Sequence, residues 1–186
     1  MPRLALFRNS YPDIDLVLQV AIPLMDVTAE PADLEVRYGA GGYTDCEHRV
    51  LQHDELSPAC SPAFLHEFGP FQGFNTLEEL SQTRLIRSPL EPWTPWFQHC
   101  GVALAEPHTG SQFNDIGLLY DAAATGFGVT LARLKLAAAW FDAGRLVRLS
   151  SDAVPATHSY HLCWARGTLA RWECAAMAEW LTQALA

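Results

Sequence analysis

Residues 113–132, FNDIGLLYDAAATGFGVTLA, constrain the fold of this chain more than any other stretch. Asn114 or Asp115 can cap a helix, and the apolar residues that follow recur with the spacing of one helical face. Gly126 suits the left-handed conformation that ends many helices, and GVTLA has the composition of a buried strand. The stretch therefore predicts a helix over 116–124 that leads directly into a strand.

Short apolar runs alternate with helical patterns along the rest of the chain, which favours an α/β fold. Ser61 before Pro62 marks a helix start, and Thr76 with Glu79 forms a capping box. The last helix, 169–185, has an i, i+4 stripe of Trp172, Ala176, Trp180 and Ala184. We predict a helix over 2–10 and strands over 14–20, 33–39, 83–88, 128–132, 145–150 and 159–165.

Composition indicates a soluble protein with a substantial core. Of its 186 residues, 49% are hydrophobic and 18% are charged. No apolar run reaches the roughly 18 residues of a membrane span, and the apolar run near Met1 is too short for a secretory signal. Five cysteines without a CxxC pair are typical of a reduced protein. We expect a cytoplasmic location and no membrane contact.

The charge of the chain argues against direct binding to nucleic acid. The formal net charge is −9, and the 12 basic residues are scattered, with Lys135 the single lysine. DNA-binding surfaces draw most of their affinity from clustered basic residues that neutralise phosphates. We therefore expect this stretch of chain not to bind DNA by itself.

The sequence offers weak signals for catalysis, metals or cofactors. It has no GxSxG elbow, and GAGG at 39–42 lacks the GxGxxG spacing of a dinucleotide-binding turn. Cys46 with His48, and His158 with His161, are the nearest candidates for a metal site. Positions 158 and 161 of one strand face opposite sides of its sheet. We predict no catalytic residue, no metal and no cofactor.

Seven stretches, in order, resemble the effector-binding domain of LysR-type transcriptional regulators. They are PRLALFRNSYPDIDLVLQV, DLEVRYGAGG, LSPACSPAFL, LEELSQTRLIR, FNDIGLLYDAAATGFGVTLA, AGRLVRL and YHLCWARG. These stretches cover nearly the whole chain at the family's approximate spacing. RYGAGG together with PWTPWF is most similar to the branch of glycine-cleavage activators and β-lactamase regulators.

The resemblance implies a type 2 periplasmic-binding-protein-like fold. In such a fold two Rossmann-like α/β subdomains are joined by two crossover segments, with a ligand cleft between them. Subdomain I would comprise 1–61 plus 157–186, and subdomain II would comprise 62–156. The family's first strand and its helix-turn-helix domain would precede the helix at MPRLALF, so we expect both to lie outside this sequence.

By motif position, the resemblance also implies a set of ligand-binding residues. Arginine can hold a carboxylate through two parallel hydrogen bonds, aromatic rings supply apolar walls, and hydroxyl and amide groups orient the ligand. This chemistry suits a small organic anion or an amino-acid-like effector. The predicted residues are Arg37, Tyr38, Gly39, Ser88, Trp93, Phe113, Asn114, Thr130 and Tyr160.

Several of these residues have an alternative structural role. Arg37 could form a salt bridge with Asp33 or Glu35, and Tyr38 alternates with apolar residues that point to a core. Trp93 could cover the edge of a core.

The resemblance implies a ligand-sensing module that modulates DNA binding by a helix-turn-helix domain absent from this sequence. It also implies a homodimer formed through residues 2–20 and 116–124. Two alternatives remain open at this point: a free-standing solute-binding protein of the same fold, and a small α/β enzyme. A signal peptide would favour the former, and convergent catalytic side chains the latter.

Overall fold

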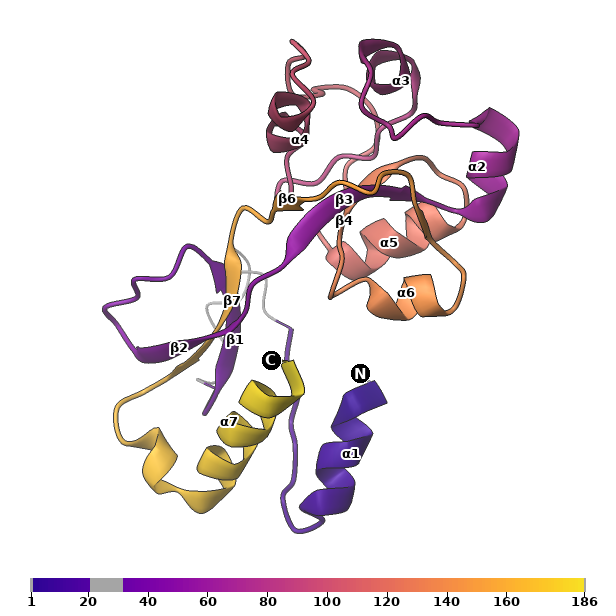
Figure 1. Cartoon of the computed structure of the whole chain (residues 1–186). Helices are drawn as coiled ribbons and strands as arrows, with labels where there is room; N and C mark the ends of the chain where they lie inside the picture. Colours follow the sequence, from indigo (N-terminus) through magenta and orange to yellow (C-terminus); the bar gives the residue numbers. More distant parts are fainter. Residues whose placement is uncertain (1, 21–31, 186) are drawn as a thin grey trace. The chain divides into compact units, whose positions relative to one another are not determined.

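A computed structural model describes residues 2–20 and 32–185 and confirms the mixed helix-and-strand architecture (Figure 1). Its residues group into two compact units. Unit 1 comprises residues 1–53 and 158–186, and unit 2 comprises residues 54–157. The chain therefore passes twice from one unit to the other, at 53–54 and at 157–158.

Unit 1 is built on a three-stranded antiparallel sheet. The strand order is β1 (Glu35–Gly39), β7 (Ser159–Trp164) and β2 (Glu47–Gln52). The short 3-10 helix η1 (Thr168–Ala170) leads from β7 to α7 (Trp172–Leu185). Leu51, Leu162 and Ala178 form the buried centre between this sheet and α7. β2 was not predicted from the sequence.

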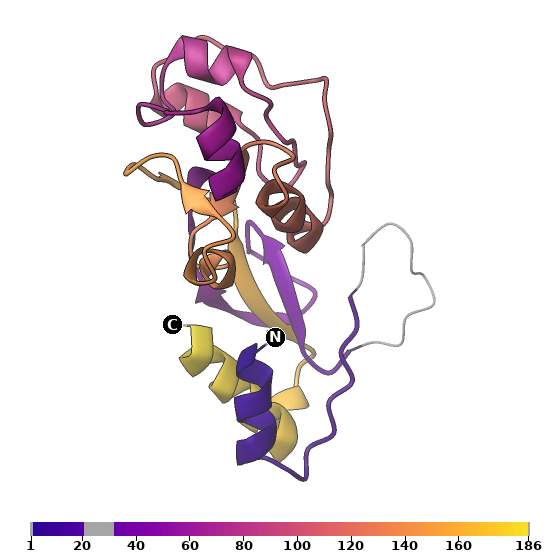
Figure 2. The ribbon, with the colours of Figure 1, turned by 90° about the vertical axis from the view of Figure 1, so that its right-hand side faces the viewer.

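Helix α1 (Pro2–Ser10) lies beside α7 in both views (Figure 1, Figure 2). The fully buried Phe7 anchors it, with its ring 5.3 Å from Trp180 and 4.9 Å from Tyr11. The strand predicted over 14–20 is wrong, because these residues form no ladder with any residue that the structure describes. Val17 and Val20 are 83% and 90% exposed.

The i, i+4 stripe of the last helix does not form one buried face, because its Trp180 packs against Phe7 while its Trp172 is exposed. The residues of α7 that become buried are Cys174 and Ala178, whereas Trp172 is 61% exposed. The sheet of unit 1 selects the face that carries Ala178, together with the partly buried Leu181 and Leu185. Two apolar i, i+4 rows run along this helix, and only the packing surface decides between them.

Unit 2 is organised around one central strand, β3 (Glu55–Cys60), which was not predicted from the sequence. All of its residues except Glu55 are buried. It pairs antiparallel with β4 (Thr130–Arg133), β5 (Val147–Arg148) and β6 (Val154–Pro155). These pairings place β3 in unit 2, which begins at residue 54, whereas the resemblance to the family implied a subdomain I of 1–61 plus 157–186.

Three of the five helices of unit 2 begin where the local capping signals predicted, at Ser61, Thr76 and Asp115. Ser61 Oγ accepts a hydrogen bond from Phe64 N at 3.1 Å, and Thr76 forms the capping box with Glu79. None of the helices in the described parts of the chain is long and apolar enough to span a bilayer. The five helices of unit 2 are α2 (Pro62–Phe68), α3 (Leu77–Gln82), α4 (Thr94–His99), α5 (Ile116–Ala124) and α6 (Ala138–Asp142).

Helix α4 is capped from a distance. Its N-cap residue, Trp93, contributes no side-chain cap. Instead the carboxylate of Glu106 accepts hydrogen bonds from Trp93 N at 3.0 Å and Thr94 N at 2.8 Å. The Trp93 ring is fully buried, and its indole N–H donates to the Ile86 carbonyl at 3.0 Å. Helix α4 is thereby fixed to the core that it covers.

A buried ion pair joins the loop before α4 to β4. The side chains of Glu91 and Arg133 are only 1% and 2% exposed, and Arg133 Nε lies 2.6 Å from Glu91 Oε1. The backbone N–H of Arg133 donates to the Tyr120 hydroxyl of α5 at 2.9 Å. A buried charge that loses its partner is strongly destabilising, so this pair constrains three segments at once.

We predict that Glu91→Ala lowers the stability of unit 2 by about 3–5 kcal/mol, because it leaves the Arg133 guanidinium buried without its carboxylate. At about 2–4 °C per kcal/mol, the melting temperature falls by about 6–20 °C, which differential scanning calorimetry can measure. The control is Arg145→Ala, whose pair with Asp121 is about half exposed and is worth less than about 1 kcal/mol. Equal losses in the two variants would contradict the prediction.

Candidate functional site

The strongest candidate site in unit 2 lies where neighbouring parallel segments end. Leu85 bridges Val129, and Arg87 bridges Gln112, both in parallel. Arg87 N donates to the Ser111 carbonyl at 3.0 Å, and Phe113 N donates to the Arg87 carbonyl at 3.0 Å. The chain therefore leaves both segments at the same edge, which places Ser88 beside Phe113. Ligands of open α/β sheets bind at such carboxyl ends.

Helix α5 begins at this edge. Asp115 is its N-cap, and its Oδ1 accepts a hydrogen bond from Leu118 N at 2.8 Å. The N–H groups of Ile116 and Gly117 in the first turn have no intrahelical acceptor, and the positive end of the helix dipole favours an anion there. Asn114, just before the cap, is exposed. The edge can thus offer hydrogen-bond donors to a negatively charged group.

The five predicted residues of unit 2 differ in exposure. Phe113 is half-buried, and its ring lies 6.0 Å from that of Phe127. Ser88 is buried, and its Oγ accepts from Leu90 N at 3.2 Å. Thr130 on β4 is buried as well, and Trp93 has the core position that was its alternative role. Of the five, Asn114 and Phe113 are therefore the most open to a ligand.

The predicted residues of unit 1 lie on two neighbouring strands. Tyr38 pairs with Tyr160 across β1 and β7, with ring centroids 5.0 Å apart. The Tyr38 hydroxyl accepts a hydrogen bond from His158 N at 3.2 Å. A Cβ at Gly39 would lie 2.4 Å from the Tyr43 hydroxyl, so a larger residue here would displace the Tyr43 side chain. The register thus brings both tyrosines to one end of the sheet.

Arg37 is already paired with carboxylates. Its Nε lies 2.8 Å from Glu35, the alternative partner named from the sequence, and its Nη1 lies 3.2 Å from Asp45. The Glu35 hydrogen bond is the main cause that raises the pKa of Arg37, with a smaller contribution from Asp45. Any anionic ligand of Arg37 would therefore compete with these two side chains.

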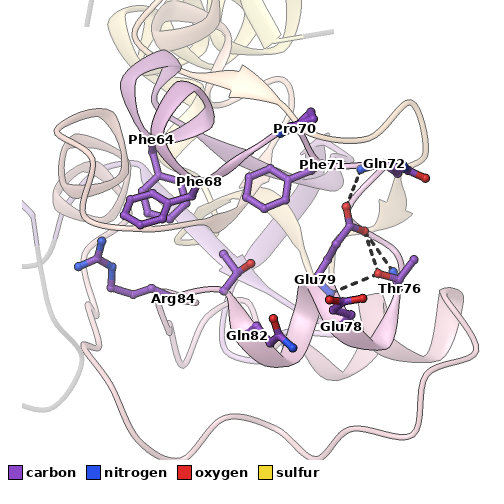
Figure 3. A pocket seen from close by; sticks show the side chains of 11 residues that line it. Phe64, Phe68, Pro70, Phe71, Gln72, Thr76, Glu78, Glu79, Gln82 and Arg84 are labelled. Atoms are coloured by element: carbon purple, nitrogen blue, oxygen red, sulfur yellow. Dashed lines mark hydrogen bonds between the residues drawn. The ribbon is translucent and has the colours of Figure 1, made fainter.

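A groove of about 840 Å³ between α2 and α3 was not predicted (Figure 3). Phe64, Phe68 and Phe71 form one wall, and the Arg84 guanidinium lies 5.6 Å and 5.8 Å from the first two rings. Glu79, on the opposite wall, is occupied by its hydrogen bonds to Gln72 N and Asn75 N. The sequence signal was the closely spaced phenylalanines of 64–71. The wall that faces them comes from α3 and is visible only in the fold.

Comparisons with known proteins agree on one family. The profile of the LysR substrate binding domain matches residues 1–186. The chain is 29% identical to the HTH-type transcriptional activator AmpR of Rhodobacter capsulatus, over 98% of this chain and 61% of that protein. It is 27% identical to the glycine cleavage system transcriptional activator of Escherichia coli K12, over 97% and 59%. The chain thus spans about three-fifths of these relatives.

The fold is also similar to a solved structure. The X-ray structure of the effector domain of AmpR from Pseudomonas aeruginosa matches with a TM-score of 0.81 and 27% identity. The match covers 99% of this chain and 87% of that domain. This likeness agrees with the type 2 periplasmic-binding-protein-like fold expected from the sequence.

We predict that Asp115→Ala destabilises α5 by about 1 kcal/mol, because the Leu118 N–H loses its capping acceptor. The melting temperature should fall by about 2–4 °C in a thermal melt followed by circular dichroism. Asp115→Asn retains an acceptor and should stay close to the parent protein. Asp142→Ala removes an exposed aspartate from the end of α6 and serves as the control. A loss as large in Asp142→Ala would contradict a specific capping role.

Proposed function

Because the chain belongs to the LysR substrate-binding domain family, we propose that it is the effector-sensing part of a transcriptional regulator. The relatives that it matches are transcriptional activators and not enzymes. In this proposal the chain binds a small metabolite and contributes no catalytic step. The DNA contacts are made by a helix-turn-helix domain outside these 186 residues, which accords with the net charge of −9.

The observation that carries the proposal is the convergence of Ser88, Phe113 and Asn114 at the start of α5. The parallel pairings of Arg87 and Leu85 bring these residues to one edge. The first turn of α5 can donate to a carboxylate, while the Phe113 and Phe127 rings offer an apolar surface. An effector with a carboxylate beside a small apolar group fits this chemistry.

The predicted residues of unit 1, taken by themselves, offer two kinds of contact. Tyr38 and Tyr160 offer paired aromatic surfaces. Arg37 offers a guanidinium that would exchange Glu35 or Asp45 for an anionic ligand. Such an exchange keeps the arginine paired, so it avoids leaving a desolvated charge alone.

Sensing requires that the effector distinguish two states of the regulator. A ligand that binds both states equally shifts nothing, whatever its affinity. We propose that effector binding biases the geometry of the regulator and thereby its contacts with DNA.

We further propose that the chain forms a homodimer through residues 2–20 and 116–124. Both segments expose apolar side chains, including Val17, Val20 and Leu118. Exposed apolar patches on soluble proteins commonly mark protein–protein contacts. We propose that a second copy of the chain covers these side chains, as membership of the family suggests.

Effector binding can be tested by a thermal-shift screen of small organic acids, amino acids and cell-wall peptides. A ligand at 100 times its Kd stabilises the chain by about 2.7 kcal/mol, which raises the melting temperature by about 5–11 °C. A flat screen from a chain that melts cooperatively would contradict ligand binding for the classes tested.

The variants Ser88→Ala and Asn114→Ala should raise the Kd of a ligand found in this screen about 10- to 100-fold, as expected for lost hydrogen bonds to a charged group. Isothermal titration calorimetry measures the change. The matched control is Ser81→Ala, on the exposed surface of α3.

The variants Arg37→Met, Tyr38→Phe and Tyr160→Phe test the predicted residues of unit 1 in the same titration. If Ser88→Ala and Asn114→Ala bind like the parent, the ligand lies elsewhere.

Leu118→Asp should weaken self-association at least about tenfold, because it buries a charge in an apolar contact. Sedimentation velocity over a range of protein concentrations measures the effect. Leu77→Asp is the control, because Leu77 is an equally exposed leucine at the start of α3, outside the proposed interface. A monomeric parent chain, or an unchanged dimer in Leu118→Asp, would contradict the proposal.

A further inference from the structure

The sheet of unit 1 has a polar face of which the proposed function uses Arg37 alone. Residues paired across neighbouring strands share a face, so the register puts Glu35 and His48 on the same face as Cys163, and Arg37 on the same face as His161. Leu162 alternates with these residues and contacts α7 on the other face. The polar side chains therefore lie opposite the hydrophobic core of unit 1.

The loop between β1 and β2 closes over this polar face. The Tyr43 ring lies 5.3 Å from the ring of His48 and 5.5 Å from that of His161, which is buried. Gly41 lies so close to the His161 ring that a Cβ on it would be 2.8 Å from His161 Cε1. The same loop ends at Cys46, which is thereby held against β7.

Two of the five cysteines meet at this place. Cys46 is two residues before His48, whose Cα pairs with that of Cys163, so the two cysteines are diagonal neighbours. The thiols of Cys46 and Cys163 are hydrogen-bond partners. Burial in the first place, and this contact in the second, raise the pKa of Cys163 to about 11. Cys46 is half-buried, whereas Cys163 is buried.

Arg37 adds a cation to the pair. Its Nη1 donates to Cys46 Sγ at 3.7 Å, and its guanidinium also pairs with Glu35 and Asp45 and lies 5.1 Å from the Tyr43 ring. Cysteines react with peroxides as thiolates, in accessible surroundings beside a cation. Cys46 therefore combines partial exposure, a neighbouring guanidinium and a second thiol within reach.

The other cysteines lack this combination. Burial raises the pKa of Cys60 to about 12, and Cys100 has no sulfur contact with another cysteine in the described residues. Cys174 also lies near an arginine, since Arg171 Nη2 donates to its Sγ at 2.8 Å. Cys174 is buried and, among the described residues, has no second thiol against it. A comparison of Cys174 with Cys46 therefore distinguishes the effect of a nearby cation from that of a paired thiol.

We propose that Cys46 and Cys163 form a peroxide-reactive dithiol that closes to an intramolecular disulfide. The Cys46 thiolate attacks hydrogen peroxide, an S–O bond forms, the O–O bond breaks, and the hydroxide that leaves is protonated to water. The Cys163 sulfur then attacks the Cys46 sulfenic acid as its own proton departs, the S–S bond forms, and the oxygen leaves as a second water. Two thiols are oxidised by two electrons, and one peroxide is reduced to two waters.

The geometry permits this closure with a small movement. Diagonal neighbours in an antiparallel pair are about 7–8 Å apart, and a disulfide joins Cα atoms about 4.4–6.8 Å apart. Cys46 lies in a bend just before β2, where Thr44 and Asp45 are exposed. The bend can therefore move toward β7 without disturbing the core. The disulfide would tie the β1–β2 loop to the central strand of the sheet.

The experiment treats the purified, fully reduced chain with hydrogen peroxide and then counts free thiols in denaturant. The expected count falls from five to three, dithiothreitol restores it, and peptide mass spectrometry finds a Cys46–Cys163 linkage within one chain. Cys46→Ser should abolish the linkage and slow peroxide consumption about tenfold, because it removes the attacking thiolate. Cys174→Ser is the matched control and should react like the parent.

A second variant keeps the test decisive if removal of one thiol disturbs folding. In Cys163→Ala the Cys46 sulfenic acid has no resolving thiol, so dimedone should trap it at Cys46. A circular dichroism melt of each variant confirms that it is folded. Equal oxidation of Cys60, Cys174 and Cys46, linkage between different chains, or no reaction at Cys46 in the folded parent would overturn the proposal.

Discussion

The buried pair of Glu91 and Arg133 is the interaction on which the arrangement of unit 2 depends. Arg133 ends β4, its backbone N–H binds the Tyr120 hydroxyl of α5, and its guanidinium holds Glu91 in the loop before α4. The loop, the strand and the helix that shape the candidate site therefore meet at one arginine. Because neither charge can return to water without opening the core, the three segments are held together.

The two units use their polar residues in different ways. In unit 2, parallel segments bring backbone donors and the start of α5 to one edge, which suits an anion. In unit 1, antiparallel register gathers Arg37, His161 and the two thiols on one face beneath the β1–β2 loop. A ligand-binding role and a redox role can thus belong to one chain, and Arg37 is the residue that the two proposals share.

Sequence reasoning succeeded where the signal is local. The caps at Ser61, Thr76 and Asp115 appear as predicted because a helix start is decided within four residues. It failed where the partner is distant. Strand β3 was missed because ELSPAC contains a proline, which usually argues against a central strand. The strand nevertheless holds Pro58, whose carbonyl still accepts a hydrogen bond from Leu149 N.

By itself, the sequence indicated the family through the order of its motifs. It also indicated the α/β class and the helix starts at Ser61, Thr76 and Asp115, because local spacing carries these properties. Only the tertiary structure decided which face of α7 is buried, that residues 14–20 find no strand partner among the described residues, and that Glu91 meets Arg133. It also decided that Arg37 is paired with Glu35 and Asp45. Burial and ion pairing depend on residues far apart along the chain, and only their packing specifies which side chains meet.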